Sequence, residues 1–521
     1  MIVDTAFVDQ LLTKKTLFCC PRPHAGVTIP DVTCVIDSGR QREMRFDEKR
    51  QTSRLVDCFV AKSNAKQRRG RAGRVQEGLC FHLFTKLRHD RQMADHPLPE
   101  MLRLSLQDLA LKLKIMKIRI GNSIGDALCQ ALDPPPPVNV MRAVSALVEV
   151  GALTTTEEIT PLGRRLARIP LDVHMGKFLL IATLFKSLDA ALTIAAALNS
   201  KSPFLTPFGR EAEADAAKAS FKVGHSDFLT IANAFNCWRR SVKQNHHFVF
   251  CRKSFLSHQA LQQIEELRQQ YMAFLLDSGF VQLEEETKKT ILNIRYRSGR
   301  GIKLMETPEA LDVNGNSIAA LHAALAAGLY PKLLTIDARS GQLRTLGNNQ
   351  PASVHPSSVN FRLKLGPGGH GGGAGRALPE SCNHLAYFNI VQSRKLYARE
   401  TAPVSDLALV LFCGDADFRF SCRSVYLDRN RIRWRVSRKM SKEGDAGVID
   451  GGGMPVVEPL VALRSLRILR ERVAGLITTS FRSPRRAWTE EEHLALDVAL
   501  RGIGAFANEA DKLTKSEKSA V

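Results

Sequence analysis

The residues from Gln67 to Arg74 (QRRGRAGR) have types and spacing suited to holding a phosphate group. Arg68, Arg71 and Arg74 recur at every third position, and glycines stand beside them. The glycines let the backbone turn tightly. The guanidinium groups can clamp phosphoryl oxygens, on which negative charge spreads during phosphoryl transfer. Two other interpretations stay open from these residues alone: a basic surface loop, and an arginine–glycine segment that binds RNA without a fixed structure.

The overall charge agrees with a negatively charged partner. The 521 residues include 74 Lys and Arg against 52 Asp and Glu, which gives a formal net charge of +22. Lysine and arginine bind phosphates favourably because counterions are released, although a protein can be basic without such a partner. The N-terminal residues lack a signal-peptide pattern. The most apolar stretch, 178–198, is interrupted by Lys186 and Asp189, so we expect no membrane span.

The cysteines predict neither a metal site nor a disulfide framework. There are 11 of them, with no CxxC and no repeating Cys/His spacing. We therefore expect no metal ligands, and reduced thiols typical of a reducing compartment. This favours an intracellular protein, in the cytoplasm or the nucleus.

The arginine-rich block lies in a region with a mixed α/β pattern. The β-branched run VTCVI (32–36) predicts a strand ending at a Ser-Gly turn, and GLCFHLF (78–84) predicts a second strand. Between them, 53–59 and 63–74 are typical of a short strand and a helix. These elements would carry the arginines on a loop after a helix.

Downstream, the pattern becomes helical and then strand-like. Apolar spacing predicts helices at 102–116 and 139–150, separated by a run of prolines and followed by a short hairpin, which suggests a winged helix. Residues 160–282 are again helical. Short apolar runs then suggest a small barrel: LLTIDA, SVNFRL, LAYFNIVQ, KLYARETAPV and LALVLFC. A terminal amphipathic helix is predicted beyond about residue 480.

Several blocks resemble the DEAH-box (DExH) family of ATP-dependent RNA helicases. QRRGRAGR matches the family's motif VI, and GVTIPD (26–31) matches the end of its motif V. TPLGRRLARIPLD, LTIAAALNSKSPF, HPSSVN and YFNIVQSRKLYARETAPV follow in the family's order. The resemblance covers roughly residues 26–435 and implies the C-terminal portion of such an enzyme.

The resemblance implies a multidomain fold of α/β plus α plus β class. It combines a partial RecA-like lobe, a winged helix, a helical ratchet-like bundle and an OB-fold barrel. The predicted boundaries are 1–25 for an atypical N-terminal segment, 26–92 for the partial second RecA-like lobe, 93–158 for the winged helix, 159–317 for the helicase-associated helical domain, 318–440 for the OB-fold and 441–521 for a C-terminal extension.

The resemblance also implies roles for individual residues. Arg71 and Arg74 would be catalytic fingers on the γ-phosphate of ATP, and Gln67 would position that phosphate or the attacking water. Arg40 stands where the family has a residue near the adenine. Thr28 would contact the RNA backbone. In the OB-fold, Ser393, Arg394 and Arg399 are candidate RNA contacts, although residues on alternate strand positions often only face solvent.

The sequence departs from the family in two places. It contains no GxxxxGK[ST] and no Asp-Glu-x-His, the motifs that hold the triphosphate and Mg²⁺. ATP and Mg²⁺ are thus implied as cofactors, but their main ligands are absent from this sequence. Prolines also replace the front of motif V at 19–26, so residues 1–24 look foreign to the lobe, as in a truncated gene model or a degenerate gene. The expected partners are RNA and, as in many relatives, an activator protein.

Three functions therefore remain open. One is the C-terminal portion of a helicase that couples ATP hydrolysis to RNA remodelling, needs a first RecA-like lobe and is inactive alone. The alternative is a non-catalytic RNA-binding module or helicase remnant. The third is a structural partner that supplies its arginine fingers in trans to another helicase lobe.

Overall fold

The computed structural model shows the chain as two compact units. One comprises Met1–Ala110 with Ile118–Val144, and the other Leu111–Lys117 with Ser145–Val521. The boundaries run through two helices, α5 (Gln107–Ile115) and α7 (Pro137–Val150). The structure describes residues 16–19, 32–47, 52–72, 77–116, 121, 123–296, 302–336, 342–361, 383–392, 395–428, 431–435 and 459–516.

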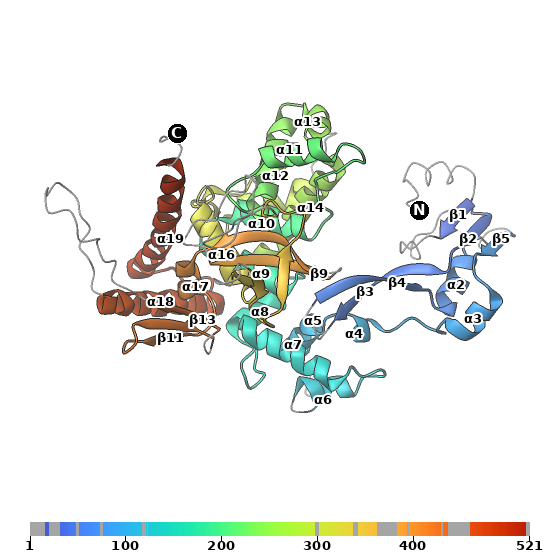
Figure 1. The fold of residues 1–521 in the computed structure, drawn as a ribbon, viewed down its shortest axis with the longest axis horizontal. Helices are drawn as coiled ribbons and strands as arrows, with labels where there is room; N and C mark the ends of the chain where they lie inside the picture. The colour runs from blue at the N-terminus through green and yellow to red at the C-terminus, as the bar shows by residue number, and fades with distance from the viewer. Residues whose placement is uncertain are drawn as a thin grey trace. The chain divides into compact units, whose positions relative to one another are not determined.

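A parallel sheet and a hairpin form the strands of the first unit. The sheet has the order β1 (Thr16–Cys19), β2 (Cys34–Asp37), β5 (Leu79–His82). The long antiparallel hairpin joins β3 (Arg40–Asp47) to β4 (Thr52–Phe59) (Figure 1). The predicted strands around β2, β4 and β5 are confirmed. Within the N-terminal segment expected to be foreign to the lobe, β1 pairs with β2 along its whole length, and the assignment of that segment stays a prediction.

Short helices complete the first unit, and its described residues form two apolar clusters. The helices are α2 (Lys62–Arg69), α3 (Lys86–Gln92), α4 (Glu100–Arg103) and α6 (Ile124–Cys129). One buried cluster contains Val32, Val35 and Ala72, and another contains Val60, Ala65 and Met93. By contrast, β5 exposes large apolar side chains at Leu79 and Phe81. An edge strand with such side chains is a surface suited to pairing or packing.

The second unit begins with a helical region that carries a large buried core. Its helices are α8 (Pro161–Leu166), α9 (Val173–Leu184), α10 (Leu188–Leu198), α11 (Glu211–Ser220), α12 (Asp227–Lys243), α13 (His247–Lys253), α14 (His258–Asp277), α15 (Glu285–Leu292) and α16 (Ile318–Leu329), with 3₁₀ turns at Asn293–Tyr296 and Glu309–Leu311. Most side chains of α9 and α10 are buried. The predicted helical stretch at 160–282 is confirmed.

Asp189 ties this helical core together. Its carboxylate accepts hydrogen bonds from Arg268 Nη2 at 2.6 Å and Thr307 Oγ1 at 2.7 Å, and lies 3.3 Å from Arg239 Nη1. Burial by itself would raise the pKa of Asp189, but Arg268 and Arg239 hold that pKa below its usual value. The charged group therefore fixes three segments around α10.

A closed barrel follows α16. Its strands run in the order β10 (Leu396–Val404), β8 (Pro351–Val354), β7 (Leu343–Thr345), β6 (Leu333–Ile336), β9 (His384–Gln392). The predicted strands at β6, β9 and β10 are confirmed, and the sequence did not predict β7 and β8. The barrel core is apolar, with Leu334, Leu385 and Ala398 among its fully buried members.

Two of the predicted barrel strands were wrong. The run LALVLFC forms a helix, α17 (Asp406–Phe412), whose Ala408, Leu409 and Leu411 are buried; an apolar run of this length fits a buried strand or a buried helix equally well. The described part of SVNFRL, 358–361, is a turn.

A small sheet and two long helices end the described chain. The sheet has the order β11 (Ala416–Arg419), β12 (Ser424–Leu427), β13 (Ile432–Arg435). The predicted terminal helix is α19 (Glu490–Ser516), and α18 (Pro459–Arg482) precedes it without having been predicted. Across the described residues, the helices are too short or too polar to cross a bilayer.

Candidate functional site

The QRRGRAGR segment is held in place by a buried ion pair. Arg68 lies near the end of α2, and its Nη1 donates to Asp37 Oδ1 at 2.8 Å and to the carbonyl oxygen of Arg40 at 3.2 Å. Asp37 is fully buried at the carboxyl end of β2, and its Oδ1 also accepts the Gly39 amide. Arg68 therefore anchors the segment, and the interpretation of Arg68 as one of three phosphate-clamping forks was wrong.

That anchor brings the end of α2 to the carboxyl edge of the parallel sheet. Gln67 is exposed on the helix and Arg71 is half-buried in the turn after it. Crevices outside the carboxyl ends of parallel strands are where ligands bind in open α/β sheets. Gln67 and Arg71 thus flank the anchored Arg68 in the first unit, and their contact with a phosphate stays a prediction. Arg74 and Thr28 lie outside the described residues.

Arg40 lies close to the end of α2, because its carbonyl oxygen accepts a hydrogen bond from Arg68. The guanidinium group of Arg40 lies over an aromatic ring. The guanidinium carbon is 3.8 Å from the centre of the Phe59 ring, and Nη1 is 3.9 Å from a carboxylate oxygen of Asp57. The side chain is largely exposed. A planar guanidinium stacked on a ring forms a flat surface onto which an aromatic base can pack.

Cys80 and His82 lie on β5, the strand next to β2, close to the Asp37 carboxylate. His82 Nδ1 lies 3.7 Å from Asp37 Oδ2. Burial, and then the Asp37 carboxylate, raise the pKa of the Cys80 thiol. This thiol is therefore held in its neutral form and is a poor nucleophile.

The barrel places Arg399 beside other titratable groups. Arg399 is half-buried on β10, opposite Asn389 of β9, and its Nε has no hydrogen-bond partner among the described residues. Burial raises the pKa of the adjacent Glu400 to about 6, although Arg399 opposes this shift. Ser393 and Arg394 lie outside the described residues.

A second cation lies near the same face. Lys218 of α11 donates to the carbonyl oxygen of Ser357. Burial, and then Arg399 and Lys218, lower the pKa of His355, so this imidazole is neutral at physiological pH. Arg399 and Lys218 are thus close enough to act together on one group.

A buried network joins α12 to the barrel, and sequence reasoning missed it. The Asp227 carboxylate accepts the backbone amides of Val359 and Thr401, each at 2.9 Å, and the hydroxyl of Ser358. Asn360 Nδ2 donates to Thr401 Oγ1 at 2.8 Å. The HPSSVN turn is therefore a structural joint. The signal for this joint in the sequence is a run of small polar residues next to a stretch with few predicted strands.

Three family profiles match in order, almost wholly within the second unit. The profile of the helicase-associated (HA2) winged-helix domain matches residues 143–171, that of the ratchet-like HA2 domain matches 172–231, and that of an oligonucleotide/oligosaccharide-binding (OB) fold matches 321–416.

Known proteins match over most of this chain. Mouse "Putative ATP-dependent RNA helicase DHX57" is 34% identical over 398 residues, which is 75% of this chain and 28% of the relative. Human "ATP-dependent RNA helicase DHX29" is 35% identical over 426 residues, 80% of this chain and 29% of the relative. Rat "ATP-dependent DNA/RNA helicase DHX36" is 35% identical over 410 residues, 77% of this chain and 37% of the relative.

The chain belongs to the DExH-box helicase family. It spans only about a third of the length of these relatives. The predicted family and the predicted α/β plus α plus β class, with HA2 helical domains and a five-stranded OB-type barrel, are confirmed. The exact domain boundaries and the roles of single residues stay predictions.

Proposed function

We propose that this chain is the RNA-holding C-terminal portion of an ATP-dependent RNA helicase, and that it carries the arginine-bearing half of the nucleotide site. Complete hydrolysis then requires a phosphate-binding lobe that holds the P-loop and the DExH motif. Because the chain covers about a third of its relatives, their helicase activity is part of this proposal.

The observation that carries the nucleotide half is the Arg68–Asp37 anchor. It supports Gln67 and Arg71 at the carboxyl edge of the sheet, with the exposed Arg40–Phe59 stack beside the same turn. In this proposal Arg71 and Arg74 neutralise charge on the γ-phosphate, Gln67 orients that phosphate or the attacking water, and a base packs near Arg40.

Mg²⁺ does not fit the described residues as a resident ion. No group of three His, Cys, Asp or Glu side chains among them could hold a metal. The resemblance implies Mg²⁺ on the triphosphate, and its ligands would come from the phosphate-binding lobe. In this proposal the guanidinium and amide groups of this chain position the triphosphate and neutralise its negative charge.

RNA binding rests on the barrel and on the overall charge. OB-type barrels bind single strands by combining a basic surface with packing surfaces for bases. Arg399 and Lys218 are two cations that act on one group near the barrel, and we propose them together with Thr28, Ser393 and Arg394 as RNA contacts. The net charge of +22 favours a polyanion as the partner.

A second candidate function is RNA binding without hydrolysis. It is favoured by one observation, which is that the 521 residues contain no GxxxxGK[ST] and no Asp-Glu-x-His. In that case the arginine segment would contact RNA or a partner's nucleotide instead of a nucleotide held by this protein.

Fluorescence anisotropy with a labelled single-stranded RNA tests the shared part of both functions. We expect binding whose logarithmic affinity falls linearly with the logarithm of salt concentration. A chain that binds no RNA at about 50 mM salt, where phosphate contacts are strongest, would contradict both. An Arg71→Ala variant serves as the internal comparison: unchanged RNA affinity is expected if Arg71 contacts a nucleotide, and weakened RNA binding is expected if the arginine segment contacts RNA.

A further inference from the structure

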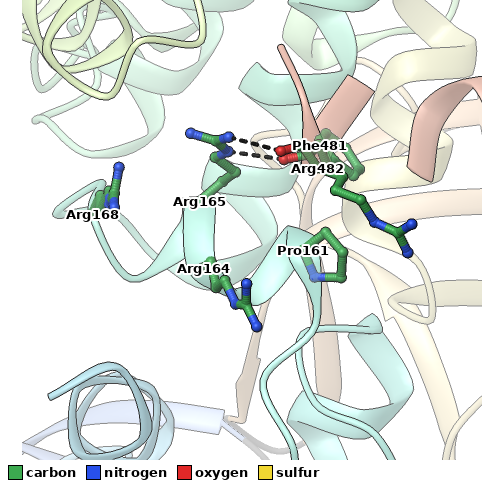
Figure 2. A pocket seen from close by; sticks show the side chains of 6 residues that line it. All are labelled: Pro161, Arg164, Arg165, Arg168, Phe481 and Arg482. Carbon is green, nitrogen blue, oxygen red and sulfur yellow. Dashed lines mark hydrogen bonds between the residues drawn. The ribbon is translucent and has the colours of Figure 1, made fainter. Parts of the chain in front are cut away.

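A cavity in the second unit is lined mainly by arginines. Its volume is about 450 Å³. It lies where α8 meets the end of α18, and its lining residues are Pro161, Arg164, Arg165, Arg168, Phe481 and Arg482 (Figure 2). A cavity of this volume is large enough for a ligand the size of a nucleotide.

Arg165 has a structural role at this cavity. Its Nε donates to the carbonyl oxygen of Phe481 at 2.9 Å, and its Nη1 donates to that of Ser278 at 3.2 Å. These carbonyls belong to the ends of α18 and α14, whose last carbonyls have no partner within their own helix. Arg165 therefore joins two helix ends and is not available to a ligand.

The other three arginines have no counter-ion within the described part of the chain. Among the residues that the structure describes, Arg164, Arg168 and Arg482 form no ion pair or hydrogen bond through their side chains. Arg164, Arg168 and Arg482 are exposed. Figure 2 shows Arg164 and Arg482 on either side of the Pro161 ring, while Arg165 alone reaches the helix carbonyls.

The cations at this cavity repel one another. Burial, and then the charge of Arg168, lower the pKa of the Arg165 guanidinium, although Arg165 still carries its charge at neutral pH. Like charges around one cavity are unfavourable until an anion enters. Three other arginines of α18 and α19 differ, because Arg467, Arg472 and Arg501 each pair with a carboxylate.

We propose that this cavity binds the phosphodiester backbone of single-stranded RNA, with Arg164, Arg168 and Arg482 as the phosphate contacts. The proposal rests on the proposed RNA-holding function and names a contact surface apart from the barrel. Arginine is suited to phosphate because its planar fork donates two parallel hydrogen bonds. The spread of three guanidinium groups around a cavity of about 450 Å³ fits successive phosphates of a chain better than one isolated ion.

The test compares two triple variants of the full chain that lose the same charge. One carries Arg164→Gln, Arg168→Gln and Arg482→Gln. The matched control carries Arg467→Gln, Arg472→Gln and Arg501→Gln, which removes three acid-paired arginines from α18 and α19. Arg165 stays unchanged in both because it holds helix ends. Circular dichroism and thermal midpoints establish that both variants fold.

The measured quantity is the salt dependence of binding to a labelled oligouridylate. Each phosphate contact on a single strand contributes about 0.7 to the slope of log K against log salt. The cavity variant should therefore lose about 2 units of slope, and the control should keep the slope of the unmodified chain. Equal slopes for the two variants, with RNA binding retained, would overturn the cavity proposal and leave the proposed function standing.

Two further outcomes separate the remaining possibilities. If the unmodified chain binds no RNA at low salt, the proposed function is wrong, and the proposal that the cavity binds RNA is wrong as well. An oligoglutamate that binds the unmodified chain but not the cavity variant, while RNA binding is equal in both, would assign the cavity to an acidic protein segment and overturn the proposal.

Discussion

Replacing Asp227 by alanine should loosen the barrel from the helical region that precedes it. Asp227 is buried, and its carboxylate accepts the backbone amides of Val359 and Thr401 together with the Ser358 hydroxyl. The hydroxyl can turn to another acceptor, but the two amides cannot. A buried donor left without a partner costs about 1–3 kcal/mol. The Asp227→Ala change should therefore cost about 2–6 kcal/mol for the two amides together.

Hydrogen exchange followed by mass spectrometry measures this cost locally, which suits a chain of several domains. Because 1.4 kcal/mol corresponds to a tenfold change in an equilibrium, exchange of peptides covering 355–361 and 396–404 should accelerate by roughly 30-fold or more. Asp227→Asn should have a smaller effect, since one carbonyl oxygen remains. Asp417→Ala removes an exposed carboxylate that pairs with Arg419, and it should change neither peptide. Unchanged exchange in Asp227→Ala would refute the reasoning.

Three other predictions concern separate parts of the chain. Arg68→Ala removes the ion-pair partner of the buried Asp37 and should lower the stability of the first unit by about 3–5 kcal/mol. Hydrogen exchange of peptides covering 34–37 and 62–69 measures this loss. Arg69→Ala, which changes an exposed neighbour, should leave the exchange of both peptides unchanged. Burial lowers the pKa of His174 to about 3 from 6.5 in the unfolded chain, so stability should be lost as pH falls from about 6.5. His174→Gln should flatten this part of the thermal midpoint's pH dependence, and an unaltered profile would contradict it. Arg399→Gln should weaken RNA binding and reduce the salt slope by about 0.7; an unchanged slope would remove Arg399 from the RNA surface.

The sequence predicted the elements whose pattern is local. The β-branched run before Asp37 gave β2, and the apolar periodicity of 160–282 gave the helical region. The residues of QRRGRAGR predicted a phosphate-contacting segment, but their spacing could not show that Arg68 points to Asp37. That contact joins residues 31 positions apart, and no periodicity encodes it.

The remaining misses have a common physical cause, because tertiary packing decided them. LALVLF is apolar at every position, so its pattern fits a buried strand or a buried helix equally well. It becomes α17, whose Leu409 and Leu411 are fully or almost fully buried. Likewise Arg165 is one of several arginines in GRRLAR, and only the folded chain shows that it holds the ends of α14 and α18. The joint at Asp227 depends on residues more than 130 positions away.

The ATPase activity of the purified chain, with and without single-stranded RNA, tests the central claim most directly when measured beside the Arg71→Ala variant. The proposal predicts salt-sensitive RNA binding in both proteins and no hydrolysis in either, because the triphosphate ligands are supplied by another lobe. RNA-stimulated hydrolysis that disappears in Arg71→Ala would contradict it, since the chain would then hold a complete nucleotide site without a P-loop.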